Sequence, residues 1–102
     1  MVNAEISIIP VGTGSSSVSD YVAAAVSELE ASGLRVTLTA TGTSVEADSP
    51  EDLFGALSRA QEAVFRQGAG RAYTILKMDD RRDEEGHSQE EMVRSVRESQ
   101  DR

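Results

Sequence analysis

Hydrophobic and polar residues alternate in two stretches of this chain. The first runs from about Val2 to Val11, where Ala4, Ile6 and Ile8 alternate with Glu5, Ser7 and Ile9. A period of two is typical of a β-strand with one buried face. The second stretch, Leu34 to Glu46, predicts two antiparallel strands joined at Gly42. Its period places one set of residues on the buried side (Leu34, Val36, Leu38 and Ala40) and another on the opposite side (Thr37, Thr39, Thr41 and Glu46).

Two other stretches have the spacing of amphipathic helices. Ser17 and Asp20 form a pair like a capping box, which predicts that the first helix begins after Ser17 and ends at Gly33. Ser49 and Pro50 give a second start signal, and Gly68 closes that helix. The apolar stripes are Val18, Tyr21, Val22, Ala25, Val26 and Leu29 in the first helix, and Leu53, Leu57, Ala60 and Val64 in the second.

A last strand is expected from Arg71 to Met78. We place Leu76 and Met78 inward, because the other phase would bury Lys77 without a partner. The resulting order, β-α-β-β-α-β, predicts an α+β, ferredoxin-like fold: a four-stranded antiparallel sheet with two helices on one face and the other face open.

The tail differs from the rest of the chain. We expect residues 1–78 to form the ferredoxin-like domain, and residues 79–102 to form an acidic loop followed by a C-terminal amphipathic helix. Residues 79–102 contain nine Asp or Glu and five Arg, a net charge of −4. Ser88 and Glu91 make a capping box ahead of Met92, Val93 and Val96. A free helix of about ten residues is marginal, so this one either docks on a subunit or frays.

Composition excludes several classes of function. The 102 residues include 18 acidic and 10 basic side chains, a net charge of −8 that opposes binding to nucleic acid or anionic lipid. There is no cysteine, and no apolar run approaches the ~20 residues that span a bilayer. We therefore expect a cytoplasmic protein with no membrane partner. Its small core favours a homo-oligomer.

Candidate metal and anion sites are weak. The segment from Gly12 to Ser17 could hold an anion at a helix N-terminus, but a plain turn is the better interpretation, because the lysine of a phosphate loop is missing. His87 is the only histidine and has no neighbour at metal-ligand spacing. Asp79, Asp80 and Asp83 alternate with Arg81 and Arg82, which neutralise them. We expect no metal site and no cofactor.

The threonines on the outer side of the hairpin need water, a ligand or a second subunit. Glu46 among them is a plausible receptor for a small polar cation. The alternative is an exposed strand carboxylate paired with Lys77 or Arg71 across the sheet. No G-x-S-x-G elbow is present, and no nucleophile has an identifiable base.

Several motifs together resemble the small thiamine-binding protein family of bacteria and archaea. They are the segments 17–23, 42–46 and 77–82, with Gly68, Arg71 and Ser95-Val96 between and after them. The resemblance implies a ferredoxin-like protomer that pairs into dimers and tetramers, as a dimer of dimers. It also implies binding of thiamine or its hydroxymethylpyrimidine part without catalysis. Thr43 and Glu46 would line the pyrimidine pocket, and Ser17 and Ser7 would contribute hydroxyls.

The sequence is therefore compatible with three functions. The first is a carrier or sensor of thiamine-like cations. The second is an oligomeric regulatory or assembly module without a small-molecule ligand. The third is a proton-transfer enzyme of the dimeric ferredoxin-like type, which the absence of a second carboxylate near Glu46 opposes.

Overall fold

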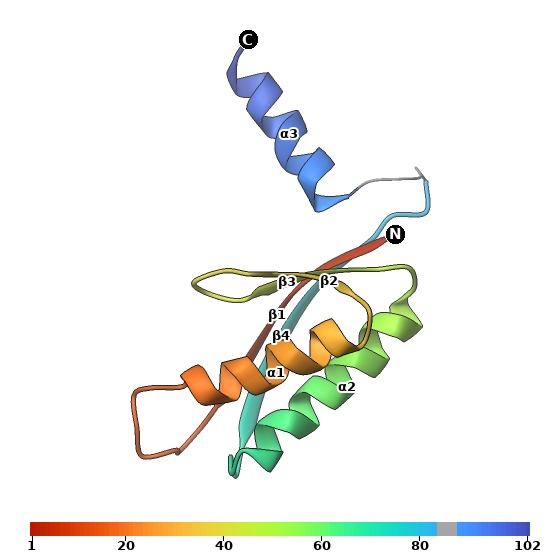
Figure 1. The fold of residues 1–102 in the computed structure, drawn as a ribbon. Coiled ribbons are helices and arrows are strands. Elements are labelled where there is room, and N and C mark those ends of the chain that lie inside the picture. The colour runs from red at the N-terminus through yellow and green to blue at the C-terminus, as the bar shows by residue number, and fades with distance from the viewer. Residues whose placement is uncertain (84–87) are drawn as a thin grey trace.

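The computed structural model describes residues 1–83 and 88–102. A four-stranded antiparallel sheet has the order β2-β3-β1-β4, and two helices cover one of its faces (Figure 1). This is the predicted ferredoxin-like arrangement with an added C-terminal helix. The elements are β1 (Val2–Pro10), α1 (Ser19–Ala31), β2 (Arg35–Leu38), β3 (Thr43–Ala47), α2 (Pro50–Arg66), β4 (Ala72–Asp80) and α3 (Gln89–Gln100).

The strand register separates the two faces of the sheet. β1 pairs with β3 from Val2↔Ala47 to Ile6↔Thr43, and with β4 along its whole length. Alternate residues of the strands point toward the helices and are mostly buried. The others lie on what we call the open face, the side of the sheet away from α1 and α2: Asn3, Glu5, Ser7 and Ile9; Ser44 and Glu46; Arg35 and Thr37; Tyr73, Ile75, Lys77 and Asp79.

The core lies between the sheet and the two helices. Leu29 of α1 and Leu53 of α2 are fully buried in it, each at a gain of about 1.5–3 kcal/mol over an exposed side chain. The predicted apolar stripe of α2 is confirmed, because Leu53, Ala60 and Val64 lie in the core and Leu57 packs against it. Alanines on the same helix allow it to pack closely on the strands. The predicted phase of β4 is confirmed by Leu76, which packs against the core. Met78, at the end of the same row, remains 43% exposed.

Two of the three predicted helix caps are confirmed. The hydroxyl of Ser49 accepts a hydrogen bond from the Asp52 amide at 3.2 Å, and that of Ser88 accepts one from Glu91 at 3.1 Å. The cap by Ser17 was wrong: α1 begins at Ser19, and its N-cap residue makes no side-chain cap bond. The Ser17 amide instead donates to the Ser15 hydroxyl at 3.1 Å. The hydroxyl-rich segment therefore closes on itself as a turn rather than capping the helix.

The predicted buried row of the hairpin is only partly correct. Val36 and Leu34 pack against the core, but Leu38 is 59% exposed and Ala40 is also exposed. β2 is a four-residue edge strand, so the hairpin beyond Val36 extends past the cover that the helices provide.

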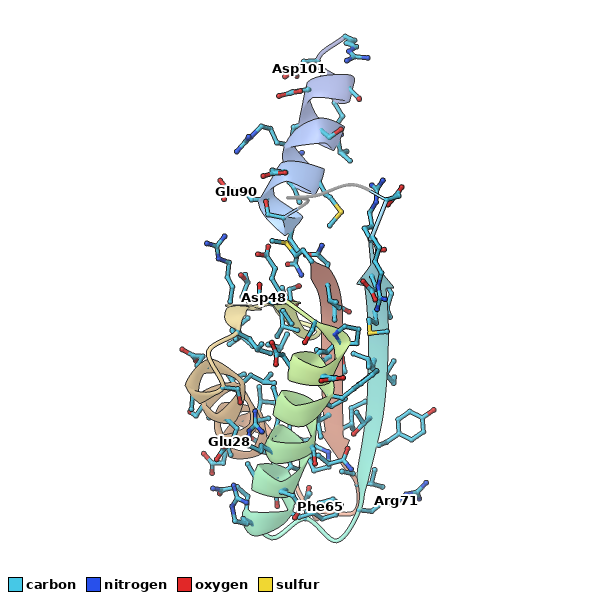
Figure 2. The ribbon with its side chains drawn as sticks, turned by 90° about the vertical axis from the view of Figure 1, so that its right-hand side faces the viewer. Glu28, Asp48, Phe65, Arg71, Glu90 and Asp101 are labelled. Atoms are coloured by element: carbon cyan, nitrogen blue, oxygen red, sulfur yellow. The ribbon has the colours of Figure 1, made fainter. Side chains whose placement is uncertain are left out.

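The tail helix projects from the body of the protein. α3 has no buried residue, and the molecule reaches 49 Å along its longest axis (Figures 1 and 2). Val93 and Val96 are 57% and 60% exposed. β4 continues to Asp80, so the regular domain extends beyond residue 78 before the tail begins.

Candidate functional site

The structure distributes the four predicted site residues over different places. Ser7 and Thr43 line one cleft, between the hairpin tip and α1. Glu46 lines a second hollow, near the turn between α1 and β2, and Ser17 lines neither. Thr43 and Glu46 differ by an odd number of positions in β3, so their side chains leave opposite faces of the sheet.

The first cleft has the character of a small-molecule site. It is a cleft of about 190 Å³ with mostly apolar walls, and four of the residues that line it carry hydroxyls. Leu38 and Ala40, which the alternating pattern placed in the core, line this cleft instead. The apolar wall comes from α1 and β1 (Val18, Val22, Ala25, Leu29, Ile6 and Ile8), and the hydroxyls come from Ser7, Thr39, Thr41 and Thr43.

Hydrogen bonds fix the hairpin tip that forms one wall. The amide and the hydroxyl of Thr39 both donate to the Gly42 carbonyl, each at 2.9 Å. The Ser7 hydroxyl donates to the Thr41 carbonyl at 3.2 Å, which joins the tip to β1. The cleft is thus preformed rather than shaped by a loose loop.

Glu5 does not line this cleft itself but stands on the open face beside Gly42, which does, a position that the sequence interpretation missed. A Cβ placed on Gly42 would lie 3.2 Å from Glu5 Cγ and 3.2 Å from Ser7 Oγ. The carboxylate therefore stands beside the backbone of a cleft residue. The period of two in β1 did place Glu5 and Ser7 on one face, but only the register with β3 brings both next to Gly42.

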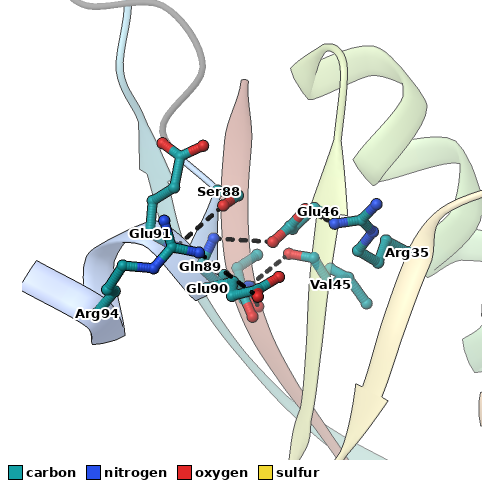
Figure 3. A network of polar contacts seen from close by, with 9 residues as sticks. Arg35, Val45, Glu46, Ser88, Gln89, Glu90, Glu91 and Arg94 are labelled. Atoms are coloured by element: carbon teal, nitrogen blue, oxygen red, sulfur yellow. Dashed lines mark hydrogen bonds and ion pairs between the residues drawn. The ribbon is translucent and has the colours of Figure 1, made fainter.

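Glu46 is held by the tail. Its carboxylate accepts a hydrogen bond from the Gln89 backbone N–H at 2.8 Å and lies 3.8 Å from Arg35 (Figure 3). The Glu46 side chain is only 10% exposed. The ion pair is made with Arg35, directly opposite on β2, so the expected partners Lys77 and Arg71 were wrong.

The side chain of Gln89 completes the attachment of α3. Its Nε2 donates to the Val45 carbonyl at 2.9 Å and to the Ala4 carbonyl at 3.4 Å. One residue thus connects the first turn of α3 to both central strands. Arg94 lies 3.7 Å from Glu90 within the helix and bonds to no strand residue in the described part of the chain (Figure 3).

Glu46 and the cleft are separate regions. In the β1–β3 register Glu46 lies opposite Asn3, four residues along β1 from Ser7. At about 3.3 Å per residue the two positions are roughly 13 Å apart. A single pyrimidine ring cannot contact both.

The acidic run after β4 pairs with its own arginines. Arg82 donates to Asp80 Oδ2 from Nε at 3.0 Å and from Nη2 at 2.8 Å, and Arg81 binds Asp83. The hydrogen bond from Arg82 holds the pKa of Asp80 below its usual value, against the opposing effect of desolvation, and the positive charge of the Met1 amino group lowers it further. The expected self-neutralised run is confirmed.

The remaining candidates do not form a site. Within residues 1–83 and 88–102, no three His, Cys, Asp or Glu side chains gather as a metal-binding group. The prediction for His87 lies outside the described residues. Tyr21 packs against the core, and Tyr73 is 56% exposed on the open face, away from the apolar wall of the cleft. No helix in the described part of the chain is long and apolar enough to cross a membrane.

Comparison with known proteins identifies relatives along most of the chain. Residues 4–97 match the profile of the family described as thiamine-binding protein. A UPF0045 protein of Methanothermobacter thermautotrophicus is 47% identical over 83 residues, which cover 81% of this chain and 84% of that protein.

Solved structures share the fold. A hypothetical protein of Methanocaldococcus jannaschii superposes with a TM-score of 0.84 at 35% identity, covering 95% of this chain and 96% of that one. A Thermotoga maritima protein, provisionally assigned to thiamine biosynthesis or salvage, has a TM-score of 0.76 at 19% identity over 93% and 97% of the two chains. Because the family profile spans almost the whole sequence, the chain belongs to the thiamine-binding protein family.

Proposed function

We propose that this protein binds thiamine or its hydroxymethylpyrimidine part and acts as a non-catalytic carrier or sensor. The observation that carries the proposal is the mostly apolar cleft at the hairpin tip, which Ser7 and Thr43 from adjacent strands both line. The family and the description of the Thermotoga maritima protein support the same ligand class.

The chemistry of the cleft suits a substituted pyrimidine. Its apolar wall can cover the ring faces. The hydroxyls of Ser7 and Thr39 already donate to backbone carbonyls and can accept from an amino group, while those of Thr41 and Thr43 can donate to ring nitrogens. The net charge of −8 favours the approach of a cation. The cleft, with a volume of about 190 Å³, has room for the pyrimidine ring.

Glu46 and Ser17 do not line the cleft, so any contact that they make with a ligand would lie outside it. A cationic ligand group that reaches the Glu46 carboxylate would compete there with Gln89 and Arg35. Glu46→Gln tests this role: a contact with the carboxylate predicts a loss of roughly 1.5–3 kcal/mol of binding free energy, the range for a hydrogen bond to a charged group. Unchanged binding would show that Glu46 holds α3 and does not contact the ligand.

Thermal shift tests the function itself. Thiamine or hydroxymethylpyrimidine should raise the melting temperature, because a ligand that prefers the folded state stabilises it. Thr43→Val keeps the shape and removes the hydroxyl, and Ser7→Ala removes the other, so each should reduce the shift. Ser27→Ala, on the outer side of α1, is the matched control. No shift with any thiamine-related compound, checked by calorimetry, would refute the proposal.

A second function, a regulatory or assembly module, is favoured by the exposed apolar residues. Val93 and Val96 of α3 and Ile9, Tyr73 and Ile75 of the open face are all about half exposed. Surfaces of this kind mark contacts with other subunits, so we also propose a homo-oligomer. From the family resemblance we propose that it is a dimer of dimers, and we propose that it resides in the cytoplasm. Light scattering at micromolar concentration tests it, and a stable monomer would contradict it.

A further inference from the structure

Glu5 is a carboxylate on the open face that has no bonding partner within the described residues. It is partly buried, yet no hydrogen bond or ion pair among residues 1–83 and 88–102 engages it. Lys77 lies directly opposite in the β1–β4 register, and no ion pair joins the two side chains in the described part of the chain. Covering a carboxylate without a partner costs free energy, so a partner from outside the chain is favoured.

Glu5 lies beside Gly42, one of the residues that line the cleft. Gly42 lines the cleft, and a Cβ added there would approach Glu5 Cγ at 3.2 Å and Glu5 Cδ at 3.3 Å. Glycine at this position leaves room for the carboxylate to pass close to the hairpin backbone. Ser7, two residues along the same strand face, also borders the cleft.

Glu46 and Asp79 are the other carboxylates on this face. Asp79 lies opposite Asn3, at the end of β1 away from Ser7, and Glu46 already has bonding partners. It accepts the Gln89 amide at 2.8 Å and pairs with Arg35 at 3.8 Å. It also lies roughly 13 Å from Ser7 along the sheet. Of the three carboxylates, only Glu5 stands beside a residue of the cleft and has no bond within the described part of the chain.

We propose that Glu5 is the residue that selects a cationic or aminopyrimidine ligand in the cleft. An exocyclic amino group or a protonated ring nitrogen would donate to the Glu5 carboxylate, a charge-assisted hydrogen bond stronger than one between neutral groups. Ser7 and Thr43 would then position the ring, and Glu5 would supply the preference for positive charge. This inference rests on the proposed function and assigns it a specificity residue.

Calorimetry on the full chain with thiamine and with hydroxymethylpyrimidine is the test. Glu5→Gln keeps the size of the side chain and removes the charge, so the dissociation constant should rise about 10- to 100-fold. Glu5→Asp keeps the charge on a shorter arm and should recover part of the affinity. Glu62→Gln, which removes an exposed carboxylate on α2, is the matched control and should bind as the wild type does.

The outcomes separate this inference from the function it rests on. If the wild type binds neither compound, the proposed function fails, and the role of Glu5 fails with it. If the wild type binds and Glu5→Gln binds equally well, only the role of Glu5 is refuted. A loss confined to Glu46→Gln would assign charge recognition to the other carboxylate. Melting curves show whether each variant is folded; should Glu5→Gln be unfolded, Glu5→Asp provides the comparison.

Discussion

Glu46 of β3 accepts a hydrogen bond from the Gln89 backbone N–H at 2.8 Å, and so joins the sheet to the first residue of α3. This amide is one of the N-terminal donors that a helix cannot satisfy internally. A carboxylate at this end of a helix is also favoured by the helix dipole. Since α3 buries none of its residues, Glu46 and the Gln89 side chain carry its attachment to the domain.

We predict that breaking this attachment releases α3 without unfolding the sheet. Gln89→Pro removes both the N–H and the side-chain amide, while proline is well tolerated at the first helical position. The extended backbone of Ser88, with φ −75° and ψ 160°, is compatible with a following proline. Limited trypsin digestion should then cut at Arg94 and Arg97 faster, with the melting temperature little changed. Gln89→Ala, which keeps the N–H, should have an intermediate rate; equal rates in all three proteins would contradict the attachment.

Deleting residues 88–102 should weaken self-association and leave the β-α-β-β-α-β unit folded. The reason is that α3 contributes apolar surface through Val93 and Val96 but no buried core residue. Sedimentation velocity and circular dichroism measure the two effects. A truncated protein that keeps both its mass in solution and its melting temperature would show that α3 takes no part in assembly.

Gly42→Ala should disturb the cleft more than the fold. The new Cβ would meet Glu5 Cγ and Ser7 Oγ at 3.2 Å, so both side chains must shift. We expect a destabilisation of about 1 kcal/mol, at the low end for overpacking, together with weaker thiamine binding. Gly70→Ala is the control, because nothing lies within 4 Å of its Cβ. Equal affinity for both variants in calorimetry would separate Gly42 from the binding site.

The Asp80–Arg82 pair should be visible in an NMR titration. Arg82 lowers the pKa of Asp80 mainly by donating a hydrogen bond to its carboxylate. Because the folded pKa is lowered, the stabilisation is present above the unfolded value of about 3.9 and is lost as the pH falls through the folded pKa. Arg82→Gln should move the Asp80 midpoint upward toward the usual value. An unchanged midpoint would show that the pair does not form in solution.

Ligand binding should not depend on a metal ion. The cleft is lined by apolar side chains and hydroxyls, a donor set that divalent cations bind poorly. Calorimetry after exhaustive chelation should therefore reproduce the untreated result. A signal lost on chelation and restored by one divalent ion would overturn this expectation.

Local sequence signals predicted most of the fold. The period of two in β1 and the Ser49-Pro50 start signal identified their elements, because burial and capping there are decided by neighbours along the chain. Ser17 failed as a cap because competing hydroxyls at Thr13 and Ser15 close the preceding turn first. That competition between nearby side chains has no periodic signature.

The site depended on contacts that sequence periodicity does not encode. The pairing of Glu46 with Arg35 follows from the β2–β3 register, and its bond to Gln89 spans 43 positions. The position of Glu5 beside Gly42 likewise requires β1 and β3 to be neighbours in the sheet. The alternation of apolar and polar residues correctly predicted which face of the sheet each β1 residue occupies. It could not predict which strands lie beside β1.

The exposed valines of α3 make its helical state conditional. A helix of about twelve residues is marginal in water, and this one gains little from burial. Any surface that covers Val93 and Val96 would therefore also shift the equilibrium of the tail from coil toward helix. Helix content measured against protein concentration would then report directly on association, with the tail serving as its own indicator.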